Sequence, residues 1–255
     1  MKIYIMTDLE GASGVFKFAQ TRDPAAPLFR EAMEYLMGDI AAVVKGLRES
    51  GVRQITVFDG HSSGNNFIPH LMEPGAEYLT GVPASTKDWG LDKNCSGLIL
   101  LGFHAMAGTE DGVLYHTQSM PNETRYWYNG VECGEMVQVA LWAGHFNVPP
   151  IMVTGDMATC REARRFFGKH CVTVAVKKGI TRESACLYPF AETRQALYEG
   201  AKKAVKAVPL CRPYKLRMPI KARVWFLEKE KSRTNVTERV GRITDLSNYR
   251  NIVSF

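Results

Sequence analysis

Five short apolar runs constrain the fold of this chain most strongly, because polar side chains hardly interrupt them. Runs of this kind are typical of strands in a parallel sheet whose two faces are both covered. We therefore predict five central strands. The runs are KIYIMTD (2–8), QITVFD (54–59), GLILLGF (97–103), PIMVTGD (150–156) and CVTVAV (171–176).

Helical patterns lie between several of these runs. The clearest spans Phe29 to Leu47, where apolar residues recur every three or four positions and so share one helix face. Shorter patterns cover 134–146 and 159–167, and a longer one covers 191–208. Strands that alternate with helices predict an α/β fold, with a mostly parallel central sheet flanked by helices and joined by right-handed crossovers.

Two segments depart from this alternation. RYWYNGVEC (125–133) places Asn-Gly between aromatic and β-branched residues, which is a strong hairpin signal. Past Pro209, prolines become frequent and basic, strand-like segments follow. We predict an α/β domain over 1–210 and a smaller β-rich segment over 211–255, with the final NIVSF as its last strand.

The net charge of +6 is concentrated in that last segment. Residues 211–255 hold 11 Lys and Arg residues against 4 Asp and Glu residues, whereas the first 210 residues are close to neutral. Basic and apolar residues alternate there, as on a half-exposed strand. A solvated strand face is therefore favoured over an RNA-binding patch, and we expect no nucleic-acid partner.

The composition also bears on the cellular compartment. No apolar run approaches the roughly 20 residues of a membrane-spanning helix, and the N-terminus lacks the pattern of a signal peptide. We expect a cytoplasmic protein without a membrane partner. The six cysteines are scattered without a C-x-x-C pair, which argues against a zinc ribbon or a disulfide framework and predicts that most are small buried residues.

Acids and histidines follow the first three predicted strands. Asp8 and Glu10 come after the first, Asp59 and His61 after the second, and His104 after the third. Functional crevices in open α/β sheets lie beyond the carboxyl ends of the strands. Because these strand ends meet at one edge of the sheet, we expect the five side chains to gather there.

Each of these residues alone has an ordinary structural explanation. An acid at a strand end is commonly a turn former or a helix cap, and a lone histidine is commonly a hydrogen-bonded structural residue. Together, carboxylates and imidazoles form the ligand set of a pair of divalent ions. Oxygen and nitrogen ligands without a thiolate suit Zn²⁺, with Mn²⁺ or Co²⁺ as alternatives.

Further candidates rest on weaker signals. His116 lies in a loop-like region, and Glu135 opens a predicted helix, where the helix dipole alone also favours an acid. Asp59 either orients the neighbouring histidine or only forms a turn. Asn65 and Asn66 either line a substrate cleft or belong to an ordinary loop.

Several motifs occur together in a familiar order. They are TDLEG (7–11), DGHSSGNN (59–66), LGFHAMAG (101–108), GVLYHTQSM (112–120), NGVECGE (129–135), PIMVTGD (150–156) and AVKKGITRESACLYP (175–189). From the N-terminus to about Pro189, the chain thereby resembles the zinc-dependent D-aminopeptidases associated with bacterial dipeptide transport.

The resemblance implies a role for each candidate ligand. Asp8 would bridge two zinc ions. Glu10 and His61 would complete the first zinc site, and His104 and Glu135 would complete the second. Two Zn²⁺ ions per chain are thus expected.

The resemblance also implies the reaction and the assembly. His116 matches the catalytic histidine of the family and would bind no metal. We expect hydrolysis of the N-terminal peptide bond of short peptides that begin with a D-amino acid, with His116 donating a hydrogen bond to the developing oxyanion or carrying a proton. The family implies a homo-oligomer, a decamer of two pentameric rings. Members of the family continue past the last β segment into a C-terminal helix, whereas this sequence ends at NIVSF.

Other functions remain as alternatives at this point. Two-metal sites built from Asp, His and Glu also serve phosphoesterases, and an L-aminopeptidase or an isopeptidase would use the same ligand set. A metal-stabilised binding protein, or an RNA binder that uses the basic tail, is the non-enzymatic alternative.

Overall fold

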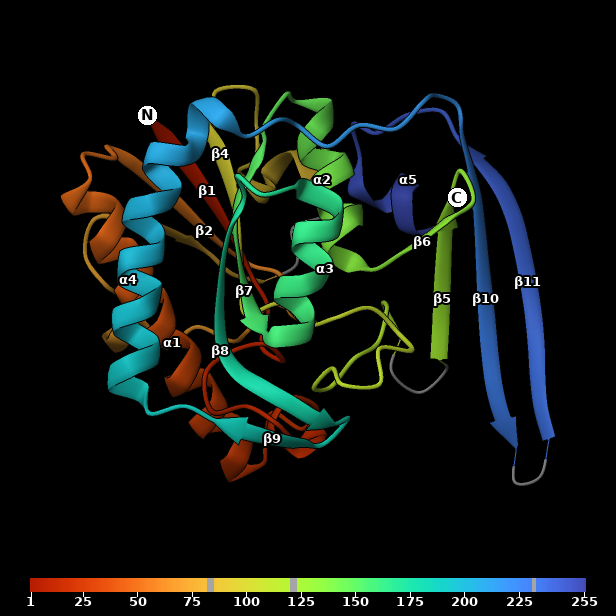
Figure 1. The fold of residues 1–255 in the computed structure, drawn as a ribbon, viewed down its shortest axis with the longest axis horizontal. Helices are drawn as coiled ribbons and strands as arrows, with labels where there is room; N and C mark the ends of the chain where they lie inside the picture. Colours follow the sequence, from red (N-terminus) through yellow and green to blue (C-terminus); the bar gives the residue numbers. More distant parts are fainter. Residues whose placement is uncertain (82–84, 120–122, 231–232) are drawn as a thin grey trace.

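Two β-sheets and the helices around them make up the computed structural model, which describes residues 1–81, 85–119, 123–230 and 233–255. The larger sheet has the strand order β3-β2-β1-β4-β7-β8-β9 (Figure 1). Its strands are β1 (Lys2–Thr7), β2 (Gln54–Asp59), β3 (Glu77–Leu79), β4 (Gly97–Leu101), β7 (Pro150–Asp156), β8 (Val172–Thr181) and β9 (Ser184–Leu187).

The larger sheet is parallel except for β9, which pairs antiparallel with β8. The prediction of a mostly parallel central sheet is therefore confirmed, and all five predicted strands are present. The sequence patterns did not predict β3 and β9. Strand β8 also continues past the predicted end at residue 176 to Thr181.

Helices cover both faces of this sheet (Figure 1). Helices α1 (Pro27–Glu49) and α4 (Phe190–Ala207) pack on one face, and α2 (Glu135–His145) and α3 (Met157–Phe167) pack on the other. Strand β1 shows why its apolar run is continuous: Ile3 and Ile5 join the first core, whereas Tyr4 and Met6 join the second. Short 3-10 helices occur at η1 (Phe18–Gln20), η2 (Pro69–Leu71), η3 (Thr86–Trp89) and η4 (Val208–Leu210).

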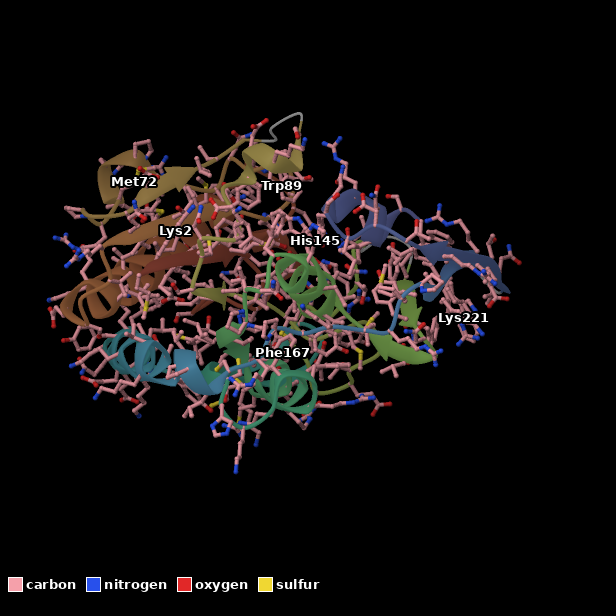
Figure 2. All side chains as sticks on the ribbon, turned by 90° about the horizontal axis from the view of Figure 1, so that it is seen from above. Lys2, Met72, Trp89, His145, Phe167 and Lys221 are labelled. Atoms are coloured by element: carbon pink, nitrogen blue, oxygen red, sulfur yellow. The ribbon has the colours of Figure 1, made fainter. Side chains whose placement is uncertain are left out.

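The second sheet is antiparallel and has the order β11-β10-β5-β6. Its strands are β5 (Glu123–Tyr128), β6 (Val131–Cys133), β10 (Ile220–Glu230) and β11 (Arg233–Ile243). The predicted hairpin is confirmed, and Asn129 and Gly130 take φ values of 51° and 84°, as a tight hairpin turn requires. Lys221 on β10 lies at the opposite end of the molecule from Met72 (Figure 2).

The segment after residue 210 is joined to the rest of the chain by this sheet. Strand β10 pairs with β5, so the two predicted domains share one sheet. Their division at 210 stays a prediction. The predicted alternation on β10 is present, because Ala222 and Val224 are buried while Arg223 between them lies over the ring of Trp127, 4.3 Å from its centroid.

The end of the chain differs from its prediction. Residues Tyr249–Val253 form a helix, α5, and not the last strand expected over NIVSF. The Asn248 side chain caps this helix by accepting a hydrogen bond from the Arg250 backbone N–H, 2.9 Å away. Tyr249 and Ile252 are buried in the second core, which a helical spacing of three residues allows.

Two further observations bear on predicted properties. Five of the six cysteines are buried, as expected for small apolar residues, and Cys186 is exposed. None of the helices in the described ranges has both the length and the apolar character needed to cross a membrane.

Glycines allow the loops after β1 and β4 and the end of β7 to approach one another closely. A Cβ atom on Gly11 would lie 1.8 Å from the Phe103 carbonyl oxygen, and one on Gly155 would lie 2.2 Å from the same oxygen. Gly11 N–H also donates a hydrogen bond to the Gly102 carbonyl, 2.7 Å away. The loops after β1 and β4 are therefore in backbone contact, and this contact brings their polar side chains together.

We predict that Gly11→Ala lowers the free energy of unfolding by about 2 kcal/mol or more, because the new methyl group must displace a backbone carbonyl. The control is Gly51→Ala, where φ is +82° but no atom lies within 4 Å. That variant should lose only about 1 kcal/mol from backbone strain. Urea denaturation measures both, and equal losses would contradict the close approach at Gly11.

Candidate metal site

A cavity of about 580 Å³ lies at the carboxyl ends of β1 and β2. The sequence predicted that carboxylates and imidazoles would gather at this edge, and they do. Those on the cavity wall are Asp8, Glu10, Asp59, His61, His116 and Glu135, and His104 is buried beside them.

His104 lies between two carboxylates. Its Nε2 is 3.3 Å from Asp8 Oδ2 and 3.5 Å from Glu135 Oε1. Its other ring nitrogen, Nδ1, donates a hydrogen bond to the Ala105 carbonyl, 3.0 Å away. Because a carbonyl only accepts, Nδ1 carries a proton, so Nε2 is the ring nitrogen that a cation could bind together with the two carboxylates, in exchange for any proton held there.

Glu10 and His61 form a second close pair, with 3.3 Å between Glu10 Oε1 and His61 Nε2. Asn66 orients this imidazole, because its Oδ1 lies 3.2 Å from His61 Nδ1. Asp59 in turn fixes Asn66, accepting hydrogen bonds from its Nδ2 at 2.8 Å and from its backbone N–H at 2.7 Å. Of the two roles left open by the sequence, these contacts favour an orienting role for Asp59, which acts on His61 through Asn66. Asn65 is exposed, and neither asparagine is on the cavity wall.

His116 stacks on His104, with 3.9 Å between the ring centroids and 13° between the planes. Its Nδ1 donates to the Leu114 carbonyl at 2.8 Å, so Nε2 faces the cluster 3.8 Å from Glu135 Oε1. Ligand atoms of His104, His116 and Glu135 lie within 4.8 Å of one another, as do those of Asp8, Glu10 and His104. His116 thus lies within reach of the same charged centre as the five predicted ligands.

Unsatisfied polar atoms mark the centre of the cluster. Asp8 Oδ2, Glu10 Oε2 and His104 Nε2 are buried without a hydrogen-bond partner among the described residues. A buried polar atom without a partner costs free energy, so such atoms are rare unless a ligand satisfies them. Two carboxylate oxygens and an imidazole nitrogen are ligands that zinc accepts, so the residues present fit this metal.

The protonation of the cluster shows how negative its potential is. Burial and the nearby Glu10 raise the pKa of Asp8 well above its usual value, whereas His61 outweighs burial and holds the pKa of Glu10 well below its usual range. Burial acts to lower the pKa of His61 and of His104, but the carboxylates beside them raise it to about 10 and about 9. Protons here take the place that a bound cation would occupy.

His116 behaves in the opposite way. Burial, and then the charge on His104, lower the pKa of His116 to about 4. The imidazole is therefore neutral around pH 7 and has a free lone pair on Nε2.

The sequence patterns did not identify several residues around the site. Gln118 donates a backbone hydrogen bond to Glu135 Oε1 at 2.7 Å, and its side chain donates to the Tyr249 hydroxyl at 3.0 Å. Tyr249 and Arg250 of α5 line the cavity, as does Arg22 near the N-terminus. No local signal marks these residues, because only the packing of the two sheets brings the last helix to the end of β1.

Comparisons with known proteins agree with this architecture. A family model described as D-aminopeptidase, of the M55 peptidases, matches residues 1–250. A D-aminopeptidase of Bacillus subtilis (strain 168) is 32% identical over 198 residues, which are 74% of this chain and 68% of that protein. The solved structure of the Zn-dependent D-aminopeptidase DppA from Bacillus subtilis, described as a self-compartmentalizing protease, has the same fold. Its TM-score is 0.89 at 24% identity, and the match covers 99% of this chain and 96% of that chain.

The family model and the curated relative both cover most of this chain, and the cluster at the end of β1 provides the polar residues that a hydrolase requires. The chain therefore belongs to the D-aminopeptidase family of M55 peptidases.

Proposed function

We propose that this chain is a zinc-dependent aminopeptidase that hydrolyses the N-terminal peptide bond of short peptides beginning with a D-amino acid. The observation that carries the proposal is the cluster of buried carboxylates and imidazoles, three of whose atoms have no hydrogen-bond partner among the described residues. The D-aminopeptidase relatives support the substrate class, and the description of DppA as Zn-dependent supports the metal.

The proposed ligands follow from the pairs in the cluster. Asp8 would bridge two ions, because its carboxylate faces His104 and is close in sequence to Glu10. Glu10 and His61 would hold one ion, and His104 and Glu135 the other. Zinc bound at these residues would supply the Lewis acidity that makes water a better nucleophile and polarises the scissile carbonyl.

His116 would act as the proton carrier. Its Nδ1 is occupied by the Leu114 carbonyl, so only Nε2 can exchange a proton in the cavity. A neutral imidazole at this position can take a proton from the attacking water and return it to the amine of the leaving residue. The water oxygen then stays on the acyl product, and the proton taken from water ends on the leaving amine.

The rest of the cavity wall suits a short peptide. Arg22 and Arg250 line it with positive charge, which fits the carboxylate at the end of a peptide. Phe58, Trp89 and Tyr249 add apolar surface against which a side chain can pack.

We also propose a homo-oligomer, the decamer of two pentameric rings that the resemblance implies. The description of DppA as self-compartmentalizing supports an assembly of this kind. Sedimentation velocity tests it, and a monomer across the micromolar range would refute it. The cytoplasmic location stays a prediction.

The function is tested with D-alanyl and L-alanyl dipeptides and a generic phosphate ester. We expect hydrolysis of the D-alanyl peptides, loss of activity after chelation and recovery when zinc is added, with two zinc ions per chain by elemental analysis. Preferential hydrolysis of the phosphate ester, or full activity without metal, would refute the proposal.

His116→Ala should keep both zinc ions and lower the turnover number by roughly 10²- to 10⁴-fold, because the proton carrier is removed. Steady-state kinetics and elemental analysis measure the two effects. His145→Ala, an exposed histidine at the end of α2, is the control and should behave like the unmodified chain. A variant with an unchanged turnover number would rule out this role, and loss of zinc would show that His116 is a ligand.

Asn66→Ala should weaken zinc binding by about 10- to 100-fold, because the His61 imidazole loses the acceptor that orients it. Competition with a chelator measures this affinity. The matched control is Asn65→Ala, since Asn65 is its exposed neighbour on the same loop. Equal affinities in the two variants would contradict the orienting role of Asn66.

A further inference from the structure

Lys177 is a fully buried lysine on β8. Within the described ranges no carboxylate lies within ion-pair distance of its ammonium group. Its Nζ instead donates hydrogen bonds to three backbone carbonyls, those of Glu10 at 2.7 Å, Ala12 at 2.8 Å and Val15. Burying a charge is expensive, so a lysine placed here without an ion-pair partner calls for an explanation.

The three acceptors belong to one loop, the loop that follows β1 and carries the cluster. Three carbonyl acceptors match the three N–H groups of an ammonium ion, so the geometry favours the charged form, while burial lowers the pKa of Lys177 to about 8. Because Glu10 is one of the three acceptors, the ammonium fixes its backbone, and so the direction from which its side chain reaches His61.

The structure of β8 delivers Lys177 to this loop. The pairing of β7 with β8 shifts register between Gly155 and Asp156, so that Asp156 lies opposite Lys177 and Val176 is the extra residue. After the shift, Lys177 still pairs with the last residue of β7, so it lies at the carboxyl edge of the sheet, where β1 also ends. The carboxylates that act on its charge are first Asp156 and Asp39, and then Glu10 and Asp8.

We propose that Lys177 is a positioning residue for the metal site. Its ammonium group fixes the backbone of the loop from Glu10 to Val15 through three hydrogen bonds, and it thereby places the Glu10 side chain where it can bind the cation. This inference rests on the proposed function for the identity of the cation. The ordering of the loop itself depends only on the contacts of Lys177 with the three carbonyls.

The test compares Lys177→Met with Val174→Ala. Methionine keeps the length of the side chain and removes the donors, whereas Val174→Ala removes buried apolar contacts from the same strand and leaves the loop alone. Both variants should lose stability, so stability alone does not decide. Amide hydrogen exchange over residues 10–15 and zinc affinity by chelator competition are the deciding measurements.

We expect exchange over residues 10–15 to accelerate at least about tenfold in Lys177→Met, and the zinc dissociation constant to rise about tenfold or more. Val174→Ala should stay within about twofold of the unmodified chain in both measurements. Equal behaviour of the two variants would overturn the proposal. If Lys177→Met does not fold, Lys177→Gln, which keeps an amide donor group, is measured in the same way.

The two measurements separate this inference from the proposed function. A chain that binds no zinc overturns the proposed function, and exchange over residues 10–15 then still decides whether Lys177 holds the loop. A chain that binds zinc with the same affinity in Lys177→Met leaves the proposed function standing and overturns the role of Lys177.

Discussion

The rest of this structure depends on burying two carboxylates at the end of one strand. Asp8 and Glu10 are 6% and 1% exposed, and like charges at such a site repel each other and lose their hydration. Two imidazoles close by, those of His61 and His104, compensate part of this charge. The atoms that remain without a partner among the described residues are the ones that we propose to bind zinc.

The parallel sheet makes this arrangement possible. Neighbouring parallel strands end at the same edge, so Thr7 pairs there with Asp59, 52 positions away in sequence, and with Leu101, 94 positions away. Glycines let the loops approach until their backbones touch, and Glu135 and α5, which follow strands of the second sheet, also line the cavity. The β5–β6 hairpin positions one candidate ligand, because it leads directly into the helix that begins at Glu135.

The five central strands, the long helices, the hairpin and the gathering of the candidate ligands were predictable, because each follows from local periodicity, from the Asn-Gly turn or from the rule that parallel strands end together. The final helix was not. NIVSF is apolar enough for a strand, and its helical form depends on the cap at Asn248 and on burial of Tyr249 and Ile252 against the second core. Cores of this kind are formed by residues far apart in sequence, so a local pattern does not show them.

The sequence by itself determined which residue types meet at the carboxyl edge, since their order along the chain and the fold class were enough to bring them together. Only the tertiary structure decided what supports them. From the sequence, Asn66 either lines a substrate cleft or belongs to an ordinary loop, and Lys177 comes one residue after the predicted strand. In the structure, Asn66 orients His61 and Lys177 is buried against the Glu10 loop. The burial of a side chain and its hydrogen-bond partners depend on which residues pack around it. Those residues are distant in sequence and become neighbours only in the folded chain.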